Sequence, residues 1–179
     1  MIGAIRIGQR CPGYQKDRAQ RDGSDLLWCG SMASMGYALV SGGFGFLGSW
    51  IVRYLLDDGV KVRVLARPGE SRENLAGVDV DVIVVGDVRR PDDAIRAVAD
   101  VDTVFHVAAI YDDWAPDPTE MYDVNLRGTF NILEAARRAK VERVVYTAST
   151  VSLGRPALGE LANEETAYES WKIDFPYSR

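Results

Sequence analysis

Apolar residues along the chain fall into two alternating patterns from residue 36 onward. Short runs rich in Val and Ile predict strands, and stretches with an apolar residue every three or four positions predict helices. The predicted strands are 37–41, 61–66, 80–86, 102–109 and 142–149. The predicted helices are 46–58, 91–100, which opens on a proline, and 119–139. In the first helix, one face is predicted to carry Leu47, Ile51, Tyr54 and Leu55.

Alternating strands and helices predict an α/β fold, a doubly wound parallel sheet with helices on both faces. In such sheets ligands bind beyond the carboxyl ends of the strands, where the strand order reverses. Residues that directly follow a strand are therefore the candidates for a binding site. The segment 1–34 has no sustained period and is positively charged, unlike the remainder, so we expect an unstructured extension before a domain spanning 35–179.

Composition and charge narrow the classes of function. The formal net charge of −5 leaves no basic surface of the kind that binds nucleic acid or an anionic membrane. No apolar run is long enough to cross a bilayer and no secretory signal opens the chain, so we predict a cytoplasmic protein. Cys11 and Cys29 lack metal-ligand spacing, and the single histidine, His106, reads as a packed strand residue, so no metal site is expected. The expected partner is a small-molecule substrate, and a homodimer is left open.

A glycine-rich segment, SGGFGFLGSW, follows the first predicted strand and opens the first helix. Its glycines fit the spacing GxxGxxG, and with Gly43 as the first glycine they also fit GxGxxG. A glycine turn between strand and helix lets a diphosphate approach bare backbone at the positive end of the helix. The segment therefore predicts a dinucleotide site. Its cofactor-binding residues are predicted to be Gly42, Gly45, Phe46, Leu47 and Gly48.

The loop after the second predicted strand bears on which dinucleotide binds. NAD sites usually place an acidic residue there to bind the ribose hydroxyls, whereas the sequence VLARPGES puts Arg67 at that position. A guanidinium can bind a 2′-phosphate through two parallel hydrogen bonds, so NADP is the predicted cofactor, with Arg72 as a second candidate for the contact. NAD is the alternative, in which Arg67 is a solvated loop residue. The lack of an acid at the strand end disfavours a flavin.

These features resemble the extended short-chain dehydrogenases/reductases, the NAD(P)-dependent epimerase/dehydratase family. The segments that carry the resemblance are SGGFGFLGS, GDVRRPDD, VFHVAA, MYDVNLRGTFNILEAA, RVVYTASTVSLG and PYSR. Within the family, residues 106–129 look most like the hopanoid-associated sugar epimerases or the dihydroflavonol-4-reductase-like branch. The resemblance implies an NAD(P)-binding Rossmann fold and hydride transfer on a nucleotide sugar, a ketone or an alcohol.

The resemblance also implies roles for particular residues. Asp87 and Val88 would hold the adenine, and Ala108 and Ala109 would line the cofactor after the fourth strand. Asn125 would sit at the active-site end of the long helix and belong to the catalytic group.

A serine and a tyrosine complete the implied catalytic group. Ser149 matches the family's catalytic serine and Tyr177 the tyrosine of its YxxxK motif. A positioned hydroxyl pair can polarise and protonate a carbonyl oxygen during hydride transfer. The family's lysine would fall two residues after Arg179, so we expect a truncated chain. Such a chain has a Rossmann fold incomplete at its C-terminus, no catalytic lysine or substrate domain, and little or no activity. The alternative is a non-catalytic NAD(P)-binding redox-sensing regulator, which needs neither hydroxyl.

Overall fold

The computed structural model describes residues 2–5, 36–111, 117–149, 152, 154, 156, 159, 161–163 and 165–168. In this part of the chain, six strands form one sheet in the order β1-β6-β5-β2-β3-β4. All neighbouring pairs are parallel except β1 with β6. The strands are β1 (Ile2–Ile5), β2 (Tyr37–Ser41), β3 (Lys61–Ala66), β4 (Val82–Val85), β5 (Thr103–His106) and β6 (Arg143–Thr147). The five parallel strands confirm the predicted doubly wound α/β fold.

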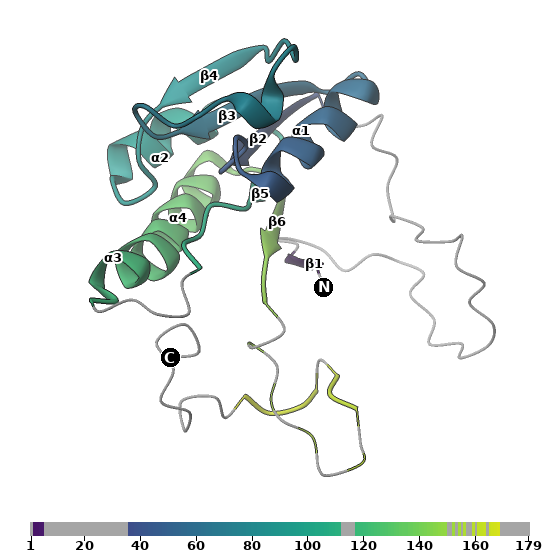
Figure 1. Cartoon of the computed structure of the whole chain (residues 1–179), viewed down its shortest axis with the longest axis vertical. Helices are drawn as coiled ribbons and strands as arrows, with labels where there is room; N and C mark the ends of the chain where they lie inside the picture. Colours follow the sequence, from purple (N-terminus) through teal and green to yellow (C-terminus); the bar gives the residue numbers. More distant parts are fainter. Residues whose placement is uncertain are drawn as a thin grey trace, which may run out of the picture.

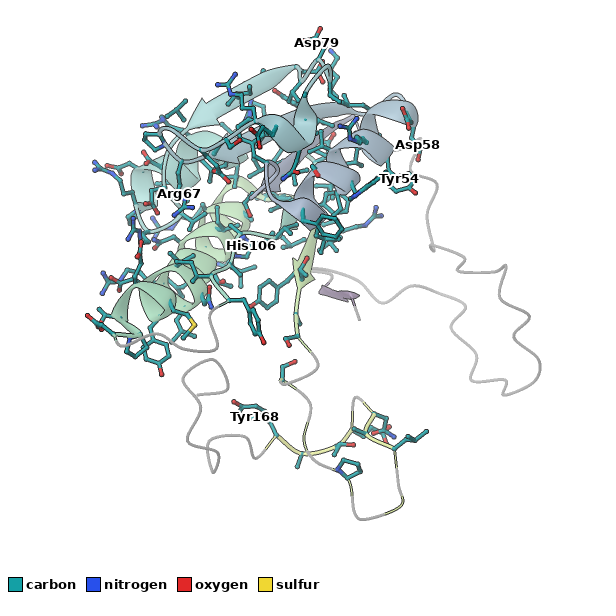
Figure 2. All side chains as sticks on the ribbon, viewed as in Figure 1. Tyr54, Asp58, Arg67, Asp79, His106 and Tyr168 are labelled. Carbon is teal, nitrogen blue, oxygen red and sulfur yellow. The ribbon has the colours of Figure 1, made fainter. Side chains whose placement is uncertain are left out.

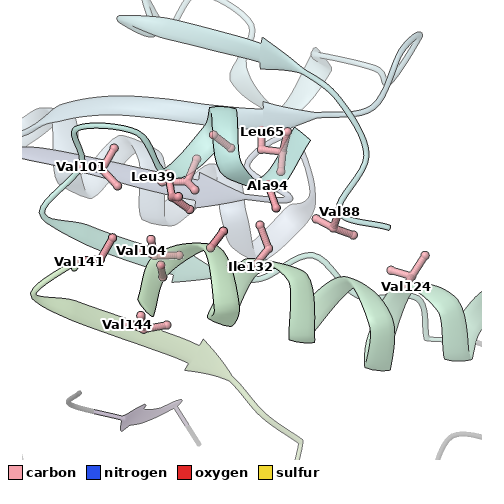
Figure 3. Packing of buried hydrophobic residues seen from close by; sticks show 14 residues of the cluster. Leu39, Leu65, Val88, Ala94, Val101, Val104, Val124, Ile132, Val141 and Val144 are labelled. Carbon is pink, nitrogen blue, oxygen red and sulfur yellow. The ribbon is translucent and has the colours of Figure 1, made fainter. Parts of the chain in front are cut away.

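Helices cover both faces of the sheet, with α1 on one side and α2 and α4 on the other (Figure 1). Each helix packs against valine-rich strands, so the sheet contributes to two apolar layers. In the layer under α2 and α4, Ile132 packs with Leu39, Val104 and Val144 of three adjacent strands (Figure 3). The helices are α1 (Phe46–Asp57), α2 (Pro91–Val98), α3 (Thr119–Tyr122), α4 (Thr129–Ala139), the 3₁₀ turn η2 (Glu73–Leu75) and the π-helical segment η3 (Asp123–Gly128).

The face that α1 buries differs from the predicted one. Leu55 is buried as expected, but Tyr54 is 65% exposed and Leu47 lies at the surface. The buried residues are Gly48, Ser49, Val52 and Leu55. The reason is the glycine turn: Gly48 lies directly against the backbone of Gly42, and this close approach sets the rotation of the helix. The spacing of apolar residues along the sequence could not predict that backbone contact.

The predicted helix 119–139 begins and ends where expected but is not uniform. Its first turn is α3, its middle is η3, and α4 completes it. A π-helical segment widens the backbone ring by one residue, and such segments occur often at functional sites. Here it contains Asn125, whose side chain bonds to a loop of the candidate site described below.

The first strand departs from the expectation for residues 1–34. Residues 2–5 form β1, which pairs antiparallel with β6, Ile2 opposite Thr147 and Ile5 opposite Val144. The prediction of an unstructured extension does not hold for these four residues, and residues 6–34 lie outside the described part. The sequence did not predict this strand because four residues are too few to show a period. The outer edge of β6 offers a row of backbone N–H and C=O groups, and a strand can pair with them whatever its side-chain pattern.

Among the described residues, no helix combines the length and the apolar character needed to span a membrane.

Candidate functional site

A cavity of about 620 Å³ opens at the carboxyl ends of the parallel strands. It lies where the strand order reverses, because the chain leaves β2 toward β3 and β4 and returns on the other side of β2 as β5. The cavity is lined by every residue predicted to bind the cofactor: Gly42, Gly45, Phe46, Leu47, Gly48, Arg67, Asp87, Val88, Ala108 and Ala109. The structure thus brings these residues together, and their roles toward a cofactor stay predictions.

The glycine turn between β2 and α1 has no room for a side chain at Gly42 or Gly48. Gly42 has φ +70°, and a Cβ there would lie 2.9 Å from both the N and the Cα of Ala108. A Cβ on Gly48 would lie 2.1 Å from the carbonyl oxygen of Gly42. Gly45, the N-cap of α1, makes no side-chain hydrogen bond, so the N–H groups of the first turn remain for another acceptor. Bare backbone and a helix N-terminus facing a cavity fit the diphosphate of a dinucleotide.

The loop after β3 presents both a cation and an anion to the cavity. Arg67 is exposed, and the carboxylate of Glu70 accepts the backbone N–H of Arg67 at 2.9 Å. The N–H of Glu70 donates in turn to the Arg67 carbonyl at 3.2 Å, which closes a tight turn. Figure 2 shows Arg67 at the periphery of the fold. Glu70 therefore holds the loop that carries the arginine, and the sequence analysis did not identify it.

Asp87 and Val88, which follow β4, are held in place by neighbours on two helices. The backbone N–H of Asp87 donates to the Asp93 carboxylate of α2 at 2.8 Å, and the Val88 carbonyl accepts from the Asn131 amide of α4 at 3.0 Å. Hydrogen bonds from the Arg89 side chain lower the pKa of the Asp87 carboxyl. Asp87 is therefore an ionised hydrogen-bond acceptor at the cavity wall.

His106, at the end of β5, is fully buried, which confirms the prediction of a packed residue (Figure 2). Ser41 Oγ accepts the N–H groups of Val107 and Ala108, at 3.2 and 3.4 Å, so its own hydroxyl donates to His106 Nδ1 at 2.6 Å. The imidazole is then left to donate from Nε2 to Thr129 Oγ1 at 2.9 Å. This chain of bonds joins β2, β5 and α4 beneath the cavity. Burial lowers the pKa of His106 to about 4, so the ring is neutral at pH 7.

Asn125 uses both ends of its amide on the backbone of Ile110. Its Oδ1 accepts the Ile110 N–H at 2.8 Å, and its Nδ2 donates to the Ile110 carbonyl at 2.8 Å. Ile110 lines the cavity, so Asn125 positions the loop that follows β5. The structure gives its side chain this positioning contact, and the catalytic role that the resemblance implies for Asn125 stays a prediction.

We expect Asn125→Asp to destabilise the fold by about 1–3 kcal/mol, because a carboxylate oxygen would replace the donor that faces the Ile110 carbonyl. Asn163→Asp is the matched control: the described contacts of Asn163 use its Oδ1 as an acceptor, from the Glu165 N–H and the Thr166 hydroxyl, and an aspartate keeps that function. Urea unfolding at pH 7 measures both variants. Equal stability of the two would contradict the positioning role.

Of the two residues whose hydroxyls are predicted to act as a pair, Ser149 and Tyr177, the structure describes Ser149. Ser149 follows β6, and its carbonyl accepts the N–H and the hydroxyl of Ser152 at 3.0 and 2.6 Å. Within the described part of the chain, the cavity lining includes Thr147 from this segment but not Ser149. Tyr177 lies outside the described residues. The pairing of the two hydroxyls therefore stays a prediction.

Comparison with known proteins decides the family. The profile of the NAD dependent epimerase/dehydratase family matches residues 38–179. The chain belongs to this family. It is 40% identical over 131 residues to a protein of Synechocystis sp. whose name includes dihydroflavonol 4-reductase, a match that covers 73% of this chain and 37% of the relative. It is 31% identical over 169 residues to the 2-alkyl-3-oxoalkanoate reductase of Shewanella oneidensis, covering 93% of this chain and 41% of the relative.

A solved structure shows the same fold in three dimensions. The UDP-glucose 4-epimerase of Thermus thermophilus, in complex with NAD, superimposes with a TM-score of 0.66 at 34% identity, over 79% of this chain and 46% of that chain. Family members are NAD(P)-dependent oxidoreductases or epimerases, so NAD(P) is the cofactor by family. The chain spans less than half the length of each of these relatives.

Several cavity residues of this family member were not singled out in the sequence. Most of them lie at the end of a parallel strand or in the loop that follows it, and Val124 lies on the helical run after β5. The rule that ligands bind at the carboxyl ends of strands could have found most of them. They are Leu65, Glu70, Gly86, Val107, Ile110, Tyr111, Val124 and Thr147.

Proposed function

We propose that this chain forms the dinucleotide-binding part of an NADP-dependent enzyme that transfers a hydride at a carbonyl or hydroxyl carbon of a nucleotide sugar, ketone or alcohol. One observation carries the proposal. A single cavity at the switch point of the sheet is lined by the glycine turn, by Arg67 and by Asp87. The cavity thus holds groups suited to a diphosphate, a 2′-phosphate and an adenine.

In this proposal each group has a separate task. The N–H groups at the start of α1 bind the diphosphate, and the glycine turn leaves space for it. Ala108, held by Ser41, and Ile110, held by Asn125, line the cavity from the loop after β5. The nicotinamide supplies or accepts the hydride when bound. Ser149 and Tyr177 are proposed to polarise and protonate the substrate oxygen, the role that hydroxyl groups take in general acid catalysis.

Titration of the chain with NADPH, NADH and FAD, followed by nucleotide fluorescence, tests the proposal. We expect NADPH to bind tighter than NADH and FAD not to bind. The absence of binding by either nicotinamide dinucleotide would overturn the proposal. The substrate is tested separately: carbonyl compounds and nucleotide sugars are screened for hydride exchange with the dinucleotide. Hydride exchange on any of them would exclude the redox-sensing alternative, whereas little or no exchange is the result already expected of this chain as part of an enzyme.

Arg67 is expected to set the preference for NADP. Arg67→Gln should weaken NADPH binding by about tenfold, the effect of one hydrogen bond between charged groups, and leave NADH binding within about twofold. Arg72→Gln serves as the matched control, because Arg72 lies against the ring of Phe44 and is not among the described cavity-lining residues. An equal loss for both dinucleotides in Arg67→Gln would contradict the assignment, and NAD would then be the better choice.

A further inference from the structure

Arg89 is not among the described cavity-lining residues, but its side chain contacts one of them, Asp87, through several hydrogen bonds. The proposed cofactor contacts do not include Arg89. Its Nε donates to both oxygens of the Asp87 carboxylate, at 3.0 and 2.9 Å, and its Nη2 donates to Oδ2 at 2.6 Å. Its backbone N–H donates to Asp87 Oδ1 at 2.9 Å. Two residues apart in sequence, Arg89 and Asp87 form a fork-like pair with fixed geometry.

The pair is held from both sides. Arg89 Nη1 lies 3.4 Å from the Glu120 carboxylate of α3, so the guanidinium spans the loop after β4 and the start of the helical run. The backbone N–H of Asp87 donates to Asp93. The side chains of Arg89 and Asp87 are 35% and 16% exposed, so the pair is partly withdrawn from solvent. One rotamer of Asp87 is therefore favoured over the alternatives that a free surface aspartate would sample.

The direction in which Asp87 presents its oxygens matters for base recognition. A carboxylate only accepts hydrogen bonds. Adenine carries an amino donor at position 6, whereas hypoxanthine carries a carbonyl acceptor there. The Asp87 carboxylate and the hypoxanthine carbonyl are both acceptors, so they repel each other and each loses a hydrogen-bond partner. An Asp87 with a fixed orientation therefore favours adenine over hypoxanthine. A mobile Asp87 could turn away from the carbonyl and would discriminate less.

We propose that Arg89 is a positioning residue for base selection: it orients the Asp87 carboxylate so that the cavity accepts adenine and rejects a base with a carbonyl at position 6. The inference rests on the proposed function, since Asp87 faces a base only if the cavity binds a dinucleotide. Arg89 itself needs no contact with the cofactor in this role.

The experiment compares NADPH with its hypoxanthine analogue on four proteins: the unchanged chain, Arg89→Met, Arg89→Lys and Arg90→Met. Arg90 is the matched control, because it is 74% exposed and pairs with Asp93 at 3.7 Å rather than with Asp87. We expect the unchanged chain and Arg90→Met to prefer adenine by at least about tenfold. The preference should fall to about twofold in Arg89→Met and be intermediate in Arg89→Lys, because an ammonium keeps the charge but not the fork.

The ratio of the two dissociation constants is measured within each protein, so it does not depend on the fraction that is folded. Full adenine preference in Arg89→Met would overturn the inference, and so would equal binding of both analogues by the unchanged chain; in either case the proposed function would stand. Failure of the unchanged chain to bind either analogue would overturn both.

Discussion

Alanine in place of Gly48 is expected to destabilise the fold by about 3 kcal/mol or more, the upper end of the usual effect of overpacking. The added Cβ would lie 2.1 Å from the Gly42 oxygen, 2.8 Å from the Gly42 carbonyl carbon and 2.9 Å from the Gly43 Cα. All three are backbone atoms, so no side-chain rotation relieves the contact. Helix α1 has to move away from the turn. Dinucleotide binding should weaken on the order of a hundredfold, because the turn and the helix N-terminus no longer act together.

Gly45→Ala separates the two effects. A Cβ at Gly45 would meet the Gly42 oxygen at 3.3 Å and, among the described residues other than its two chain neighbours, nothing else within 4 Å. We expect it to change stability by less than about 1 kcal/mol while still weakening dinucleotide binding, because Gly45 lines the cavity. Urea unfolding and NADPH titration of both variants give the comparison. If Gly48→Ala kept the stability and the affinity of the unchanged chain, the close approach of α1 to the turn would be refuted.

Acidification from pH 6.5 to 5 is expected to remove about 1.5 kcal/mol of stability through His106 alone. Burial holds its pKa at about 4 in the folded chain, against 6.5 as the ordinary value. Between these two values the unfolded chain binds a proton that the folded chain does not. Stability contributed by the neutral ring is therefore complete above pH 6.5 and is lost as the pH falls toward 4.

The single histidine makes this effect measurable. Its imidazole proton signals should show no titration above pH 5 in the folded chain, and a midpoint near 6.5 would contradict the burial. His106→Gln is the control, since glutamine does not titrate. Between pH 6.5 and 5, the unchanged chain should lose about 1.5 kcal/mol of unfolding free energy relative to this variant. A constant difference would show that the buried ring does not cause the pH dependence.

Much of the site was predictable because its signals are local. The glycine turn and Arg67 each directly follow a strand with a clear apolar pattern. In a parallel sheet the carboxyl ends of all strands share one edge, so positions far apart in the sequence converge on one cavity. The family resemblance added Asp87, Val88, Ala108 and Ala109, which also line that cavity.

Contacts between distant segments were not predictable in the same way. Asn125 was assigned to the catalytic group, but its amide bonds to Ile110, fifteen residues earlier in the chain. No role was predicted for Arg89 or Glu70, because the importance of each depends on the carboxylate or the loop that it holds. Side-chain geometry of this kind depends on how the loops pack, and no periodicity in the sequence describes it.

By itself the sequence determined the order of strands and helices, the class of the fold and the glycine turn, because apolar periods and the steric freedom of glycine act over a few neighbouring residues. Only the tertiary structure decided the rotation of α1, the pairing of β1 with β6 and the partners of Asn125, His106 and Arg89. These features arise from close packing and from hydrogen-bonding groups that must find partners across the fold, so they exist once distant segments have come together.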